Sequence, residues 1–284
     1  LWNRELPQDS ITLKRLRNLI LLDPNFDPQG LQLAFDGDEL VGCLYAVRRL
    51  LPMYGVELEP DTGWIPVFFV ARDYRRQGIG SRLMTAACRF LREQGRKQVF
   101  FASYAPNYIV PGIDAEAYPE GYRFLLQQGF EVQYSPVAMD KSLVGYEMDR
   151  DVLDLKAQRE GEGYTFSQAA DRDLYELIQL ATKVFNPDWG RAIREGILRG
   201  LPMERILVAR HHQRVVGFCL YGGYEGVAER FGPFGVSPAE QGKGLGKILL
   251  QMCLAQMRAE GLHTAWFLWT SETSAAGHLY QRAG

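Results

Sequence analysis

A glycine-rich stretch occurs twice in the chain. Residues 74–84 read YRRQGIGSRLM and residues 240–250 read EQGKGLGKILL, and Gly244 lies 166 positions after Gly78. The same offset relates residues on either side of the stretch without a gap: Val70 and Val236, and Gly95 and Gly261. A repeat of this length exceeds the 20 to 50 residues typical of a solenoid unit. The chain is therefore an internal duplication, and each copy is long enough to form a domain.

Both copies predict the same order of elements. Helical segments come first, then two strands joined by a turn, a third strand, the glycine loop, a helix, a strand and a short helix. The third strand is GWIPVFFVA at 63–71 in one copy and AERFGPFGV at 228–236 in the other. Gly95 and Gly261 are placed to end the helix that follows each loop. We predict an α/β fold of the α+β kind, with a mixed sheet in each of two tandem domains.

The predicted domains are residues 1–147 and 163–284, with the charged stretch 148–162 as the linker because it holds few large apolar residues. The chain begins close to its first predicted helix, so we expect the first strand of the N-terminal copy to be missing. It stops at Gly284, soon after the last predicted helix. We therefore expect the last strands of the C-terminal copy to be missing from this sequence.

Composition excludes several classes of function. The formal net charge is −2, so no basic surface for nucleic acid is indicated. There is no long uncharged apolar run to cross a membrane, and the first residues lack the core of a signal peptide. The four cysteines and four histidines show no metal-ligand spacing. We expect a cytoplasmic monomer or homodimer with free thiols and no metal.

A glycine turn that opens a helix suits phosphate, because the helix N-terminus offers unpaired N–H groups and partial positive charge. A Walker loop needs Gly, four residues and then Gly-Lys-Ser/Thr, but Gln241 stands five residues before Gly246 and Ile248 follows Lys247. A dinucleotide fingerprint needs glycine at position 247. Neither motif fits either copy.

The residues around the loop fit a different pattern. The C-terminal copy contains V-x-P-x-x-Q-x-x-G-x-G, formed by Val236, Pro238, Gln241, Gly244 and Gly246. The N-terminal copy has Val70, Arg75, Gly78 and Gly80 at the matching places. Together with the later LYQRAG at 279–284, this resembles the acetyl-CoA loop of the GCN5-related N-acetyltransferases (the GNAT superfamily), over nearly the whole chain twice. The alternative is two ordinary strand–turn–helix corners that need glycine for steric reasons.

The resemblance implies acetyl-CoA, or another acyl-CoA, as the cofactor. In that family the loop amides bind the pyrophosphate, and the exposed edge of the third strand pairs with pantetheine as another strand would. The matching positions in the C-terminal copy are Phe234, Gly235, Val236, Gln241, Gly242, Lys243, Gly244, Leu245, Gly246 and Lys247. Those in the N-terminal copy are Phe68, Phe69, Val70, Arg75, Arg76, Gln77, Gly78, Ile79, Gly80 and Ser81. A backbone N–H at the end of the strand would stabilise the oxyanion of the thioester.

The resemblance also implies that an amine attacks the thioester directly and that a tyrosine on the last helix protonates the thiolate. Tyr280 stands at that position, whereas the N-terminal copy has Leu125 there, with Tyr122 one turn earlier. Proton transfer from tyrosine to a thiolate is uphill by roughly 2 kcal/mol, so a tyrosine that only packs against CoA is the alternative. The general base is a carboxylate or a water chain near the strand. Glu229 is the candidate, and an exposed hairpin glutamate is the other interpretation.

The sequence therefore predicts an acetyl-CoA-dependent N-acetyltransferase that acts on an unidentified, small amine. Because of Tyr280, we expect the C-terminal copy to be catalytic and the N-terminal copy to be degenerate, keeping its loop for structure or a ligand. The elaborate loop at 107–130 equally suits a role of the first copy in recognising substrate. A catalytically silent acyl-CoA-binding sensor or scaffold is the alternative function, and a nucleotide-binding protein is a third.

Overall fold

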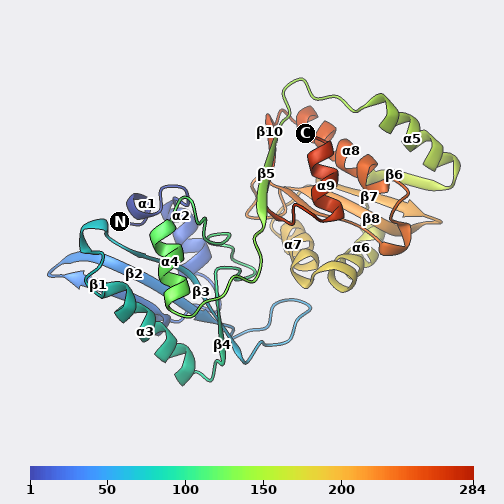
Figure 1. Cartoon of the computed structure of the whole chain (residues 1–284). Coiled ribbons are helices and arrows are strands. Elements are labelled where there is room, and N and C mark those ends of the chain that lie inside the picture. The colour runs from blue at the N-terminus through green and yellow to red at the C-terminus, as the bar shows by residue number, and fades with distance from the viewer. The chain divides into compact units, whose positions relative to one another are not determined.

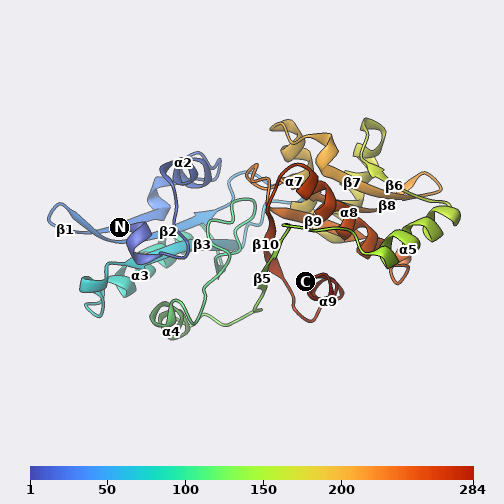
Figure 2. The ribbon, with the colours of Figure 1, turned by 90° about the horizontal axis from the view of Figure 1, so that it is seen from above.

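The computed structural model describes all 284 residues, which form two compact units, Leu1–Gln133 and Tyr134–Gly284. Each unit has a sheet with helices on both faces (Figures 1 and 2). The predicted mixed α/β class with two tandem domains is confirmed. None of the helices is both long and apolar enough to span a bilayer.

Unit 1 contains one mixed sheet in the order β1-β2-β3-β4, in which only β3 and β4 are parallel. Its strands are β1 (Leu31–Asp36), β2 (Glu39–Arg48), β3 (Thr62–Val70) and β4 (Gln98–Phe101). Its helices are α1 (Trp2–Glu5), α2 (Leu13–Leu16), the π-helical turn η1 (Arg17–Leu21), α3 (Ile79–Glu93) and α4 (Pro119–Gln127). Figure 2 shows α2 on one face of the sheet and α3 and α4 on the other.

The predicted helix after the first glycine loop is α3, and its apolar stripe explains its place. Leu83, Ala87 and Phe90 are buried and recur at helical spacing, so one face of α3 packs on the sheet. The helix ends before Gly95, whose φ of 78° is the left-handed conformation expected after a helix C-terminus. Gly261, with φ 87°, does the same for the matching helix of unit 2.

Unit 2 contains a sheet in the order β6-β7-β8-β9 and a separate antiparallel pair, β10 with β5. Its strands are β5 (Val137–Ser142), β6 (Tyr164–Gln168), β7 (Ile206–His211), β8 (Arg214–Tyr221), β9 (Phe231–Val236) and β10 (Thr264–Thr270). Its helices are α5 (Arg150–Gly161), α6 (Leu174–Leu180), the π-helical turn η5 (Ala181–Phe185), α7 (Pro187–Leu198), α8 (Leu245–Ala259) and α9 (Ala275–Arg282). In Figure 2, α7 covers one face of the sheet, and α5, α8 and α9 cover the other.

The structure differs from the predicted domain boundaries. The stretch 148–162, expected to be a linker, forms α5, which packs against α8 with Val152 fully buried. Most of its charged residues face solvent, and pairs such as Lys156–Glu160 support the helix one turn apart. The preceding segment forms β5, which pairs with β10, so unit 2 begins near Tyr134 rather than at residue 163. Unit 1 has no counterpart of β6, since its first strand follows α1 and α2.

Candidate functional site

The glycine loop of unit 2 presents a run of free backbone amides. Gly242 and Gly244 have φ values of 78° and 79°, which turn the chain sharply from β9 into α8. The N–H of Gln241 donates to Pro238 and that of Ile248 donates to Gly244, but none of the amides at 242–247 between them has a backbone acceptor. Six neighbouring N–H groups at a helix N-terminus form an anion-binding site.

The loop of unit 1 has the same backbone. The amides at 76–81 also lack backbone acceptors, and Gly78 has a φ of 80°. The counterpart of Gly242 is Arg76, which holds a positive φ of 63°. A left-handed conformation costs a residue with a side chain roughly 1–2 kcal/mol. Unit 1 therefore keeps the loop geometry at the expense of strain.

The cations beside the two loops differ in their partners. In unit 2, Lys243 donates to Glu240 at 2.7 Å and to the Tyr164 hydroxyl at 2.8 Å, and Lys247 pairs with Asp151 of α5 at 2.6 Å. The hydrogen bond from Lys243 lowers the pKa of Glu240, and the reverse contact raises the pKa of Lys243. The lysines of unit 2 are thus already neutralised by carboxylates.

In unit 1, Arg76 and Arg82 are exposed and form no ion pair, so this loop carries uncompensated positive charge. Arg76, Lys243 and Lys247 were predicted alike as loop positions, and the pairing of Lys247 with Asp151, 96 residues earlier, was not predicted.

Helix α5 supports the loop of unit 2. A Cβ placed on Gly244 would lie 2.6 Å from Leu155, so the helix touches the loop backbone directly. The Arg159 side chain donates to the Lys243 carbonyl at 2.8 Å, which leaves the amides free. The equivalent Gly78 has open space around it. This contact was not predicted, because the residues around 155 lie in the expected linker.

The end of β9 has an unpaired edge. β9 bonds to β8 along its length, whereas a single bridge near its start joins it to β10. The Ser237 N–H donates to Val216 of β8 at 2.8 Å. Because peptide groups alternate direction along a strand, the N–H and C=O groups of Phe234 and Val236 point away from β8. These groups are available to an extended ligand.

The matching edge of unit 1 is partly closed. β4 pairs with β3 only as far as Ile65, so Phe68 and Val70 are again unpaired on that side. Here the Arg75 guanidinium donates to the Val70 carbonyl at 3.0 Å. The same group pairs with Glu5 at 2.8 Å and with Glu120 at 3.0 Å. Arg75 therefore ties the strand edge to α1 and α4, whereas its counterpart Gln241 is exposed and makes no such bond.

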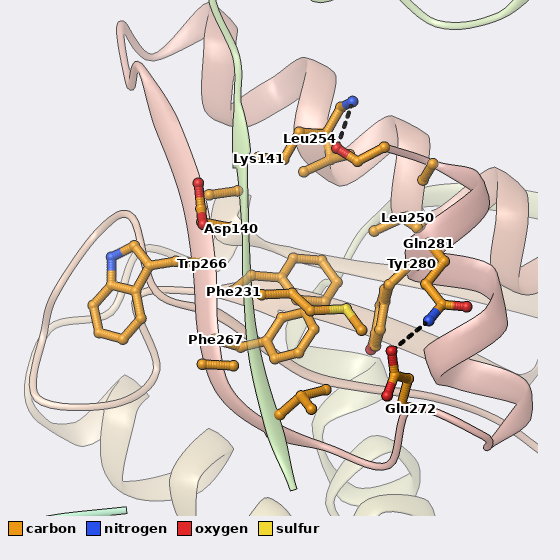
Figure 3. A pocket seen from close by; sticks show the side chains of 16 residues that line it. Asp140, Lys141, Phe231, Leu250, Leu254, Trp266, Phe267, Glu272, Tyr280 and Gln281 are labelled. Atoms are coloured by element: carbon orange, nitrogen blue, oxygen red, sulfur yellow. Dashed lines mark hydrogen bonds between the residues drawn. The ribbon is translucent and has the colours of Figure 1, made fainter. Parts of the chain in front are cut away.

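Tyr280 lies on α9 among aromatic rings beside the open edge. Its ring centroid is 4.6 Å from that of Phe267, 5.9 Å from that of Phe231 and 6.0 Å from that of Phe234. Figure 3 shows Tyr280, Phe231 and Phe267 turned toward one another; these three residues line a cavity of about 400 Å³ that β5 and β10 also border. Burial, with Cys219 and Cys253 nearby, raises the pKa of Tyr280. Its hydroxyl is therefore a protonated donor at neutral pH, and no protein group hydrogen-bonds it.

Leu125 occupies the matching position in unit 1. The residue before it, Phe124, lies 3.5 Å from the Cβ position of Gly80, just as Leu279 lies 3.4 Å from that of Gly246. Leu125 itself is buried in an apolar core. Unit 1 thus lacks a hydroxyl at this place, and Tyr122 is half-buried on the preceding turn of α4.

Glu229 lies in the turn before β9, not in the strand. Its carbonyl accepts the Trp266 N–H at 3.0 Å, and its half-buried carboxylate forms no ion pair. Five extended residues span roughly 16 Å, so the structure does not bring Glu229 to the Phe234 edge. A role as general base then requires water between them, and it stays a prediction.

Comparison with known proteins identifies both halves. Residues 2–109 match the family described as "Acetyltransferase (GNAT) family", and residues 202–284 match "Acetyltransferase (GNAT) domain". No curated protein sequence matches the chain.

Solved structures share the fold of the chain at low identity. A GCN5-related glucosamine N-acetyltransferase region of a fungal multi-domain GH3 β-N-acetylglucosaminidase is 18% identical with a TM-score of 0.72; the match covers 88% of this chain and 30% of that one. A GCN5-related N-acetyltransferase from Sphaerobacter thermophilus is 17% identical with a TM-score of 0.64, and the match covers 98% and 84%.

A tandem GNAT protein from the clavulanic acid biosynthesis pathway is 17% identical with a TM-score of 0.55, and the match covers 88% and 77%. At these identities the neighbours establish the fold alone. With a GNAT match in each half, the chain belongs to the GNAT superfamily as a tandem two-domain member.

Proposed function

We propose that this chain transfers an acetyl group from acetyl-CoA to the amine of a small acceptor, and that unit 2 performs the transfer. Membership of the GNAT superfamily indicates acyl transfer at the level of the family. One observation carries the assignment to unit 2. Its strand edge at Phe234 and Val236 is open, and the Tyr280 ring centroid lies 6.0 Å from that of Phe234, whereas Arg75 caps the edge of unit 1 and Leu125 replaces the tyrosine.

The residues of unit 2 fit an acyl-CoA. The free amides at 242–247 suit its pyrophosphate, and the edge of β9 suits the amides of pantetheine. A Cβ on Gly246 would lie 3.3 Å from the Phe234 ring, so glycine lets α8 approach the strand closely. Acetyl-CoA supplies an activated thioester to this site.

The side chains and amides of unit 2 then have separate roles. An N–H of Phe234 or Val236 stabilises negative charge on the thioester oxygen as the amine attacks. The Tyr280 hydroxyl gives its proton to the leaving sulfur. The proton of the amine passes to water and, through water, to Glu229. Because burial raises the pKa of Tyr280, proton donation depends on the negative charge that develops on sulfur.

The acceptor is to be identified with a panel of small amines. A neighbour with a TM-score of 0.72 is described as a glucosamine N-acetyltransferase region, so glucosamine belongs first in an amine panel. Titration calorimetry with acetyl-CoA, together with a thiol-release assay over the panel, tests the function. We expect binding and release of CoA with at least one amine. Binding without turnover on any amine would favour the silent sensor instead.

A further inference from the structure

Two stacked aromatic rings lie on the face of β9 opposite α8 and α9. Phe185 ends η5, and Trp189 lies in the first turn of α7. Their ring centroids are 5.3 Å apart with an interplanar angle of 21°. Both side chains are half-buried, and both meet the fully buried Phe218 ring at 83°. Phe218 thus supports both rings, and each ring remains partly exposed.

Phe185 packs on the face of β9 at a glycine. A Cβ on Gly235 would lie 2.6 to 2.9 Å from three atoms of the Phe185 ring, so only glycine admits the ring there. Gly235 stands between Phe234 and Val236, whose peptide groups face the open edge. The Phe234 side chain points to α8, where it meets Gly246, so alternation along the strand turns Gly235 to the other face.

A second glycine brings α7 close to the preceding helical turn. A Cβ on Gly190 would lie 1.9 Å from the Thr182 hydroxyl oxygen, which no side chain would tolerate. The Asn186 side chain accepts the Asp188 N–H at 2.8 Å and so fixes the start of α7. In unit 1 the position of Gly235 is Phe69, whose own ring packs on Trp2 at 5.6 Å. The stacked pair of unit 2 is thus matched in unit 1 by an edge-to-face contact in which the strand residue supplies one of the rings.

We propose that Phe185 and Trp189 form the acceptor wall of unit 2 and that the acceptor amine is carried on a ring or another flat, largely apolar body. This rests on the proposed function. The loop amides and Tyr280 lie on the α8 and α9 side of β9, so the acceptor approaches the thioester from the other side, where the two rings lie. Aromatic faces bind flat apolar groups and cations.

The charges beside the wall are already engaged. Arg191 pairs with Asp188 at 2.7 Å and with Glu195 at 2.9 Å, and the Tyr224 hydroxyl donates to Asp188 at 3.2 Å. These groups hold α7 in place. The wall therefore selects an acceptor by ring contact rather than by a free carboxylate or guanidinium.

Dead-end complexes with CoA test this wall without turnover. Titration calorimetry of the full chain saturated with CoA would compare 2-phenylethylamine with ethanolamine, which lacks the ring. We expect the ring-bearing amine to bind at least tenfold more tightly. Trp189→Ala should remove most of that preference, Trp189→Phe should restore it, and both should leave CoA affinity unchanged. Tyr175→Ala, an exposed aromatic residue on α6, is the matched control.

Equal affinity for the two amines, or an unchanged preference in Trp189→Ala, would overturn the wall. If Trp189→Ala does not fold, the comparison of Trp189→Leu with Trp189→Phe decides, because leucine should lose the preference that phenylalanine keeps. Failure of the proposed function gives a different result. It appears as no thiol release with any amine, whatever the binding preference.

Discussion

The two glycine loops share one backbone and differ in what surrounds it. Both present six free amides and a left-handed glycine before the helix. In unit 2 the loop rests on α5, its lysines are paired, and the adjacent strand edge is open beside Tyr280. In unit 1 there is open space around Gly78, Arg76 and Arg82 form no ion pair, and Arg75 caps the strand edge. The two units thus share the backbone geometry of the loop but not the side chains around it.

The largest expected effect separates the two loops directly. Gly244→Val places a β-branched residue at a φ of 79° and against Leu155, so it distorts the amides that face the phosphate. We expect kcat/KM to fall by at least about 100-fold, which is about 2.7 kcal/mol. Gly78→Val imposes the same backbone strain in unit 1 and should leave turnover within about twofold, since a change remote from the working site has little effect on it. Steady-state kinetics of both variants decide, and the reverse result would move catalysis to unit 1.

A smaller effect is expected from the tyrosine. Tyr280→Phe removes the hydroxyl but keeps the ring contacts with Phe231 and Phe267, so CoA affinity should not change. We expect kcat to fall by about 30-fold, below the usual range for a general acid because donation is uphill. Tyr122→Phe in unit 1 is the matched control. Unchanged kcat in Tyr280→Phe would leave the tyrosine with a packing role only.

Arg75 clamps the edge of β3 to Glu5 and Glu120. This clamp is tested by replacing Arg75 with glutamine, the residue at the matching position of unit 2. Arg75→Gln removes the contacts to Val70 and to the buried carboxylate of Glu5. The free energy of unfolding of unit 1 should fall by about 2 kcal/mol. Arg82→Gln changes an exposed, unpaired arginine and should shift it by less than about 0.5 kcal/mol. Urea unfolding followed by hydrogen exchange in unit 1 measures both, and equal effects would show that the clamp does not stabilise the unit.

The smallest effect is a pH dependence confined to unit 2. The pKa of Glu240 is lowered by Lys243 and Tyr164, so its contribution to stability is present above the ordinary value of 4.5 and is lost as pH falls below it. We expect at most about 1 kcal/mol, because the pair is near the surface. Glu240→Gln should flatten the fall in unit 2 stability between pH 5 and pH 3. Tyr74→Phe, at the same position in unit 1, removes a hydrogen bond to Asp36 and should leave the unit 2 profile unchanged. A flattened unit 2 profile in that variant would refute the assignment.

Local signals in the sequence were sufficient for the order of elements from α2 to α4 in unit 1 and from α6 to α9 in unit 2, but not for β5, α5 and β6. The turns at Gly78 and Gly244 have a positive φ that glycine adopts without strain, and Gly95 and Gly261 follow the ends of the next helices, so these features do not depend on distant residues. The loop amides were therefore correctly placed at the start of α3 and α8.

Features that depend on distant contacts were missed. Helix α5 was not predicted, because it is rich in charged residues and only Val152 in it is fully buried. The position of Phe185 beside Trp189 depends on Gly235, which lies about fifty residues later in the chain. The sequence predicted Gly235 only as part of a strand. The clamp on Arg75 comes from Glu5, whose position in α1 carried no signal of its own.

The pairing of β5 with β10 also constrains the order in which the parts of unit 2 can fold. Met139 lies opposite Phe267, so the two strands are separated by more than a hundred residues of intervening sequence. Contacts of such high sequence separation form late, because the long intervening loop must first be ordered. During synthesis β5 leaves the ribosome long before β10 exists. A fragment cut at residue 163 would lack β5 and leave the outer edge of β10 bare, a template for pairing with other chains.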